Sequence, residues 1–354
     1  IYTCTFGANR LKLAEFRFQG EVRKLNEELA RISRGAAGGR ALVAGNIGPT
    51  GRFVEPFGEL AFEDAVKVFK EQAKGLLDGG ADIIAIETMM DMQEARAALI
   101  AVKEICDIPV MVSMTFAEDG KTLTGSSPEA AAVTLQSLGA SAVGCNCSVG
   151  PDAMLPIICE MKKVACVPLI AKPNAGLPKL VGGRTVFDMT PEKFASFAQP
   201  FAKAGCNLIG GCCGTTHEFI SKLRGQLSKL KPRPPLRRSI SAVSSHRKVV
   251  CFGGGGSMKV IGERINPTGK EKLKDELRAG KFREAKIMAV EQKEKGADLL
   301  DVNVGASGVD EKALLPGLVK ILSGLVDLPL CIDSSDTEAV DNALRIYPGR
   351  ALIN

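Results

Sequence analysis

Several residue types are scarce in this chain of 354 residues, and their scarcity argues against whole classes of function. Only two histidines occur, His217 and His246, which weakens any Ser-His-Asp triad or histidine-based metal site. Tryptophan is absent and only two tyrosines occur, which disfavours a nucleic-acid module that stacks bases on aromatic rings. No apolar run reaches the roughly 18 residues that a membrane-spanning helix needs. The remaining composition, 45% hydrophobic and 24% charged, is that of an ordinary globular protein.

The net charge of +6 has a local origin. Nine basic residues and no acidic ones lie between Lys222 and Lys248, so the remainder of the chain carries a small negative charge. Such a run is typical of a solvated linker, and the alternative is a contact with an anionic partner such as nucleic acid. We therefore expect no nucleic-acid function and no membrane partner.

The eleven cysteines are an odd number in a chain too large to need a disulfide scaffold. The composition and the lack of a charged-then-apolar leader lead us to expect a reducing, cytoplasmic location. The first residue is Ile1 and not Met, so we expect the sequence to be part of a longer chain.

Short apolar runs alternate with helix-length amphipathic segments over residues 1–228. The runs lie at 1–6, 41–45, 82–87, 109–114, 142–147, 168–172 and 207–212. Two helices have clear start signals, Ser127 before Pro128 and Thr190 before Pro191. This alternation predicts an α/β fold with a parallel sheet. Seven strands suggest a (β/α)8 TIM-type barrel that lacks its first strand, and an open doubly wound sheet is the alternative.

The composition changes at residues 229–257, which are rich in Pro, Arg, Ser and Gly and predict a basic, Pro/Gly-rich linker. A second series of strands and helices follows over 258–354. Its strands are expected at 259–263, 298–304, 329–333 and 351–354, and its helices at 271–279, 281–295, 311–325 and 338–346. The sequence thus predicts two tandem TIM-type barrels, the second present only as its N-terminal half.

Three cysteines are placed for metal binding. Cys212 and Cys213 lie in a Gly-Gly-Cys-Cys-Gly segment at the end of a predicted strand, and Cys147 ends another. Adjacent side chains in a regular strand point to opposite faces, but the flanking glycines allow a turn that brings both sulfurs to one side. Strand ends converge at the active face of a parallel barrel, and three thiolates suit zinc with a fourth position open. Such a site suits activation of a substrate thiol for alkylation.

The first region resembles a known family. TFGANRLKL at 5–13, IETM at 86–89, Asn-Cys-Ser at 146–148 and GGCCGTT at 210–216 are similar to segments of zinc-dependent homocysteine S-methyltransferases. The resemblance implies that Cys147, Cys212 and Cys213 are the zinc ligands and the catalytic centre that holds the homocysteine sulfur. It also implies that Glu87 pairs with the substrate amino group and that Asn146 binds homocysteine.

The second region has polar residues at its strand ends, in IGERIN at 261–266, DVNVG at 301–305 and CIDSS at 331–335. Acids and amides there suit the donors of a pterin ring. These segments resemble the pterin-binding domains of cobalamin-dependent methionine synthases and of corrinoid methyltetrahydrofolate methyltransferases. The resemblance implies that Asp333 and Asn354 contact the pterin, that Asn303 lines its pocket, and that Gly269 and Lys270 approach the folate.

Together the two resemblances imply a methyltransferase of methionine biosynthesis. A methyl group would pass from 5-methyltetrahydrofolate through cobalamin (as methylcobalamin) to zinc-activated homocysteine, giving methionine and tetrahydrofolate. In that family cobalamin is carried on separate cobalamin-binding domains, supplied by the full-length chain or in trans. Two alternatives stay open: a homocysteine S-methyltransferase with another methyl donor, including a fusion to a folate reductase, and a non-catalytic structural or redox protein with a closed cysteine–zinc site.

Overall fold

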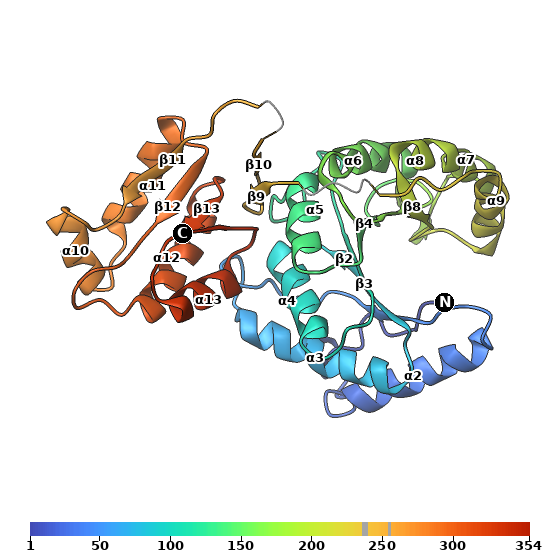
Figure 1. Ribbon diagram of the computed structural model, residues 1–354. Helices are drawn as coiled ribbons and strands as arrows, with labels where there is room; N and C mark the ends of the chain where they lie inside the picture. Colours follow the sequence, from blue (N-terminus) through green and yellow to red (C-terminus); the bar gives the residue numbers. More distant parts are fainter. Residues whose placement is uncertain (236–239, 254–255) are drawn as a thin grey trace. The chain divides into compact units, whose positions relative to one another are not determined.

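The computed structural model describes residues 1–235, 240–253 and 256–354 and divides the chain into two compact units, Ile1–Arg238 and Ser239–Asn354. Each unit is an α/β structure built on a parallel sheet (Figure 1). Within the described ranges, no helix has the length and apolar character needed to cross a bilayer.

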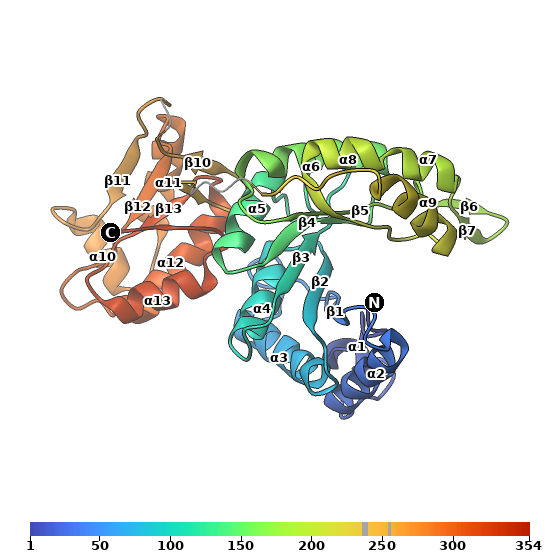
Figure 2. The same ribbon diagram turned by 45° about the vertical axis from the view of Figure 1, so that its right-hand side comes forward.

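The first unit contains a six-stranded sheet in the order β1-β2-β3-β4-β5-β8, with every pair parallel. Figure 2 labels β1 to β5 of this sheet, and Figure 1 labels β8. The strands are β1 (Ala44–Ile47), β2 (Ile83–Met89), β3 (Val110–Met114), β4 (Ala142–Asn146), β5 (Leu169–Lys172) and β8 (Cys206–Ile209). Neighbours in the sheet follow one another along the chain except where the hairpin β6–β7 intervenes, which is the succession of a TIM-type barrel. The parallel α/β fold is confirmed, and closure into eight strands stays a prediction.

Helices connect the parallel strands of this unit. They are α1 (Arg10–Ala14), α2 (Val22–Ala37), α3 (Phe62–Asp78), α4 (Met92–Lys103), α5 (Pro128–Ser137), α6 (Pro151–Val164), α7 (Pro191–Ser196), α8 (Ala198–Ala204) and α9 (His217–Leu227). The predicted start signals are confirmed, because Ser127 accepts a hydrogen bond from the backbone N–H of Ala130 and Thr190 accepts one from that of Lys193. The exposed strands β6 (Lys179–Val181) and β7 (Arg184–Val186) form an antiparallel hairpin between β5 and α7.

The strand expected at 1–6 is reduced to a single parallel bridge between Tyr2 and Ala44. Beyond that bridge, two hydroxyl groups take the place of backbone partners. The N–H of Asn46 donates to the Thr3 hydroxyl (2.9 Å), and the Thr5 hydroxyl donates to the Asn46 carbonyl (2.7 Å). The prediction of a regular strand at this position was therefore wrong, because threonine side chains compete with the backbone for the edge of β1.

The second unit has its own parallel sheet, in the order β11-β12-β13-β14. Its strands are β11 (Ile261–Ile265), β12 (Leu299–Val302), β13 (Leu330–Ile332) and β14 (Leu352–Ile353), and its helices are α10 (Glu271–Arg278), α11 (Arg283–Glu294), α12 (Glu311–Leu325) and α13 (Thr337–Ile346). A core that includes Val302, Leu318 and Ile332 lies between the sheet and these helices. The expected strands and helices of this region agree with the structure to within about two residues at most ends.

The segment 229–257, expected to be a linker throughout, is partly ordered structure. An antiparallel hairpin of β9 (Ala242–Ser244) and β10 (Val249–Cys251) belongs to the second unit. Val243 and Val250 are buried and pack with Leu299 of β12. The linker prediction relied on the basic and glycine-rich composition of the segment and overlooked the short apolar runs that form β9 and β10. Part of the predicted linker, residues 236–239 and 254–255, lies outside the described residues.

Candidate metal centre

Three cysteines from two strand ends meet in the first unit. Cys147 follows β4, and Cys212 and Cys213 follow β8 after two glycines. Their sulfur atoms all lie within 4.8 Å of one another, and the Cys147 and Cys213 sulfurs are 3.6 Å apart. A tetrahedral zinc with Zn–S bonds of about 2.3 Å would hold its sulfurs about 3.8 Å apart. The cluster therefore has the composition and the size of a three-thiolate zinc site.

The turn that carries Cys212 and Cys213 is fixed by backbone contacts. The N–H of Cys212 donates to the Pro173 carbonyl (2.9 Å), and the N–H of Cys213 donates to the side-chain oxygen of Asn174 (3.1 Å). Gly214 follows with a φ of +79°, and a Cβ added there would lie 2.3 Å from the Phe187 ring. Only glycine fits this position without strain, which explains its place directly after the two cysteines.

The backbone is also unusual at the ends of β2 and β4. Thr88, Cys147 and Ser148 each have a φ of 63°, in the left-handed region that residues with a Cβ seldom adopt. Each such residue costs about 1–3 kcal/mol and persists only where its surroundings hold it in place. At Cys147 this conformation occurs directly after β4, where the sulfur lies 3.6 Å from that of Cys213.

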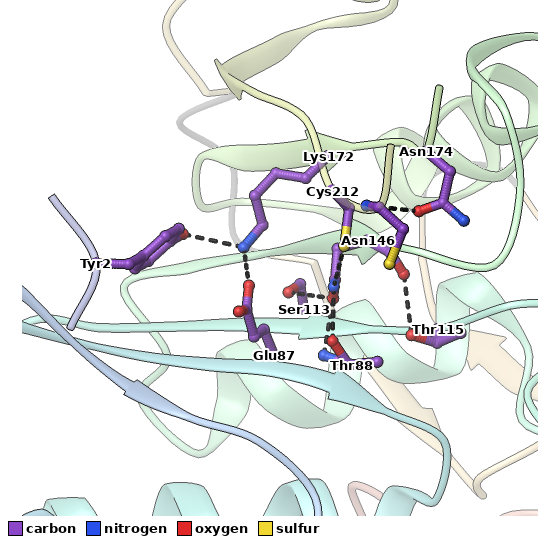
Figure 3. A network of polar contacts seen from close by, with 10 residues as sticks. Tyr2, Glu87, Thr88, Ser113, Thr115, Asn146, Lys172, Asn174 and Cys212 are labelled. Atoms are coloured by element: carbon purple, nitrogen blue, oxygen red, sulfur yellow. Dashed lines mark hydrogen bonds and ion pairs between the residues drawn. The ribbon is translucent and has the colours of Figure 1, made fainter. Parts of the chain in front are cut away.

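Asn146 links the strands around the cluster (Figure 3). Its side-chain oxygen accepts hydrogen bonds from the Ser113 hydroxyl (2.7 Å) and from the Thr88 N–H (2.8 Å). Its amide nitrogen donates to the Thr88 hydroxyl (2.8 Å) and to the Cys212 sulfur (3.8 Å). The side chain is fully buried, so its polar atoms are used within the protein. In the structure Asn146 contacts neighbouring strands and a cysteine, and the expected contact with substrate stays a prediction.

The thiols of the cluster affect one another. A hydrogen bond from the Cys212 thiol holds the pKa of Cys147 below its ordinary value, and the same bond, together with burial, raises the pKa of Cys212. Burial is the main cause that raises the pKa of Cys213. Cys145, two residues before Cys147, is fully buried, and this burial raises its pKa. Cys145 therefore behaves as a small core residue and lies apart from the cluster.

Glu87 is not isolated in the structure. The Lys172 ammonium forms an ion pair with its carboxylate and donates a hydrogen bond to the Tyr2 hydroxyl (3.0 Å), as Figure 3 shows. The side chains of Lys172 and Glu87 are only 9% and 13% exposed. Burial alone would lower the pKa of Lys172, but Tyr2 and Glu87 together raise it. Sequence reasoning missed Lys172. The feature that could have revealed it is a single positively charged residue at the end of an otherwise apolar strand.

The predicted pterin residues occupy strand ends of the second unit. Asn303 and Asp333 directly follow β12 and β13, and the Asn303 amide donates to the Asp333 carboxylate (2.8 Å). Asn354 follows β14, and its N–H donates to the Ile332 carbonyl (3.1 Å). Gly269 and Lys270 lie in the loop after β11, where the Lys270 ammonium donates to the Asn266 carbonyl (2.9 Å). The structure brings Asn303 and Asp333 into contact and leaves Gly269 exposed.

The comparison with known proteins agrees with this geometry. The family model described as homocysteine S-methyltransferase matches residues 1–227, which is more than half of the chain. The chain belongs to the homocysteine S-methyltransferase family. A second model, described as pterin binding enzyme, matches residues 262–354. The family assignment expected from the sequence is thus confirmed, and the region that follows is similar to pterin binding enzymes.

Solved structures of an Escherichia coli homocysteine methyltransferase, MmuM, are similar to the chain. The oxidized form matches with a TM-score of 0.50 at 23% identity, covering 64% of this chain and 78% of that chain. The metallated form matches with the same values. At this level of identity the likeness establishes a shared fold. The cysteine cluster, Asn146 and the Glu87–Lys172 pair all lie within residues 1–227, the part of the chain that matches the homocysteine S-methyltransferase model.

Proposed function

We propose that the first unit activates homocysteine on a zinc ion held by Cys147, Cys212 and Cys213. The observation that carries this proposal is the approach of the three sulfurs to within 4.8 Å of one another. Among the described residues no fourth cysteine, histidine or carboxylate joins the group, which suits a catalytic site with an open position better than a closed structural one. Bound zinc would lower the pKa of a thiol in that position, so that homocysteine is a thiolate at neutral pH.

The residues of the chain have separate tasks in this proposal. The three cysteines hold the metal, and Thr88 supports the cluster through its hydrogen bonds to Asn146. Asn146 orients the Cys212 sulfur through a hydrogen bond from its amide nitrogen. Such supporting contacts fix ligand direction and are worth roughly 10- to 100-fold in metal affinity. Asn146 is therefore a positioning residue in this proposal.

The second unit would supply the methyl donor. We propose that it binds 5-methyltetrahydrofolate, and that the complete reaction is methyl transfer from this folate through cobalamin to homocysteine, giving methionine. The match of residues 262–354 to pterin-binding enzymes supports a folate donor, as does the Asn303–Asp333 pair at adjacent strand ends. The Asp333 carboxylate would accept charge-assisted hydrogen bonds from the pterin N–H groups. Cobalamin would be presented by a domain other than these two units.

Metal analysis of the folded chain tests the first step. We expect about one zinc per chain in the wild type, from the three thiolates of the cluster, and much less in Cys212→Ser. Cys159→Ser is the matched control, because Cys159 is an exposed cysteine on α6. Homocysteine should bind the zinc-loaded protein at pH 7 with release of about one proton, since its thiol ionises on binding. A well-folded wild-type chain without zinc, or homocysteine binding that C212S leaves unchanged, would contradict the proposal.

A further inference from the structure

Lys172, which forms an ion pair with Glu87, borders a cavity of about 350 Å³ in the first unit. Tyr2, Lys172, Gly210 and Gly211 line this cavity, together with apolar side chains such as Ile170. A buried ion pair is a weak source of stability, because removing two charges from water offsets most of their attraction. Lys172 ends a strand that is otherwise apolar, and its place at the cavity wall points to a ligand.

Both charged groups have hydrogen-bonding capacity to spare. The Lys172 ammonium has three N–H donors, and among the described residues its hydrogen-bond partners are Glu87 and the Tyr2 hydroxyl. The ion pair uses one carboxylate oxygen of Glu87, the Oε2 atom. A free ammonium donor next to a free carboxylate oxygen is the complement of a zwitterion, a ligand that carries a carboxylate and an ammonium on one carbon.

The pair also lies close to the cysteine cluster. The backbone carbonyl of Lys172 accepts a hydrogen bond from the Cys147 N–H (3.0 Å), and Gly211, in the cavity wall, immediately precedes Cys212. Glu87 immediately precedes Thr88, whose hydroxyl is bonded to Asn146. The cavity that Lys172 borders thus adjoins the turn that carries Cys212, and this is where we place the charged end of a thiol ligand.

We propose that Lys172 binds the carboxylate of the substrate, and that it thereby restricts the site to thiols that are α-amino acids. This inference rests on the proposed function, in which the substrate thiol occupies the zinc site and Glu87 receives the substrate ammonium. In the free protein Lys172 and Glu87 neutralise each other. On binding, each charge gains its counterpart in the zwitterion, while Tyr2 keeps the ammonium of Lys172 in place.

The test compares three thiols on the zinc-loaded full chain by calorimetry. Homocysteine carries both charges, 3-mercaptopropylamine lacks the carboxylate, and 4-mercaptobutanoate lacks the ammonium. The wild type should bind homocysteine most tightly. In Lys172→Met the ratio of the homocysteine Kd to the 3-mercaptopropylamine Kd should rise by roughly 10- to 100-fold, the effect of losing one charge-assisted hydrogen bond. This ratio is insensitive to damage at the metal, because both ligands bind through the same thiol.

Further variants keep the result interpretable if K172M folds poorly, since it leaves Glu87 buried without its partner. Lys172→Arg retains the positive charge and should retain the preference for homocysteine. The double variant Lys172→Gln with Glu87→Gln carries no buried charge and should lose the ranking of the three thiols. Lys67→Met is the matched control, because Lys67 forms an exposed ion pair with Asp64 on α3 and should leave the ranking unchanged.

Two results would overturn the inference. A K172M ratio equal to that of the wild type, with homocysteine still bound, would reject the role of Lys172 and leave the proposed function intact. Failure of the zinc-loaded wild type to bind any of the three thiols would reject the proposed function, and with it this role.

Discussion

Replacing Asn146 by alanine should destabilise the first unit and weaken its metal site together. The Asn146 side-chain oxygen is the acceptor for the Ser113 hydroxyl and for the Thr88 N–H, at 2.7 and 2.8 Å. Alanine leaves both donors without this acceptor. Each unsatisfied buried donor costs about 1–3 kcal/mol, so we expect a loss of about 2–5 kcal/mol in the free energy of unfolding, with the partly exposed Thr88 contributing the smaller share.

The effect on the metal has a separate cause. Without the amide nitrogen of Asn146, the Cys212 sulfur loses a 3.8 Å contact that orients it, and Thr88 loses the bonds that hold its left-handed backbone. Loss of such supporting contacts lowers metal affinity by roughly 10- to 100-fold. Zinc affinity is measured by competition with a chromophoric chelator, and stability by hydrogen exchange of amides in β2, β3 and β4.

Asn207→Ala is the matched control for this variant. The Asn207 side chain accepts a hydrogen bond from the N–H of Leu169 at the start of β5 (3.2 Å) and donates one to the Arg233 carbonyl (2.5 Å). Loss of these two bonds should cost about 1–3 kcal/mol. Zinc affinity should stay unchanged, because Cys147 and Cys212 follow the opposite ends of their strands. If N146A binds zinc as tightly as N207A does, the reasoning that assigns Asn146 a positioning role is refuted.

Three further results are expected. Burial raises the pKa of Glu94 to about 7, so the folded protein binds more protons than the unfolded chain between about pH 4.5 and 7. The free energy of unfolding therefore falls as the pH rises through this window. Glu94→Gln keeps an acceptor for Thr50 and should therefore be more stable than the wild type by about 3 kcal/mol at pH 8, and equally stable near pH 4.5. Hydrogen exchange in α4 measures this difference. A stability difference that stays constant with pH would contradict burial of the Glu94 charge as the cause. Gly214→Ala should lower zinc affinity, because its Cβ would lie 2.3 Å from the Phe187 ring and its φ is +79°. The control is Gly225→Ala in α9, which has open space around it. It should leave zinc affinity unchanged and stabilise the helix by about 1 kcal/mol. Asp333→Asn should weaken binding of 5-methyltetrahydrofolate by roughly 10- to 100-fold in calorimetry without changing zinc content, and an unaltered Kd would remove Asp333 from the proposed pterin site.

Much of the fold could be predicted because its signals are local. The strands β2 to β5 are short apolar runs, and the starts of α5 and α7 follow from Ser127 and Thr190 beside proline. Such patterns act within a few residues, so the sequence contains them directly. The failures were also physical in origin: Thr3 and Thr5 replaced a backbone ladder with side-chain bonds, and the hairpin of β9 and β10 is stabilised by packing against Leu299, far along the chain.

The candidate site divides in the same way. The sequence by itself predicted that Cys147, Cys212 and Cys213 come together. Glycines flank Cys212 and Cys213, and the ends of parallel strands converge at one face, where Cys147 also lies. Only the tertiary structure decided what surrounds these residues. Lys172 meets Glu87 across 85 positions of sequence and meets Tyr2 across 170, and Asn146 reaches Thr88 across 58. Contacts of this kind depend on which strands are neighbours and on where each side chain points, so no local sequence pattern encodes them. Burial strengthens them once they have formed.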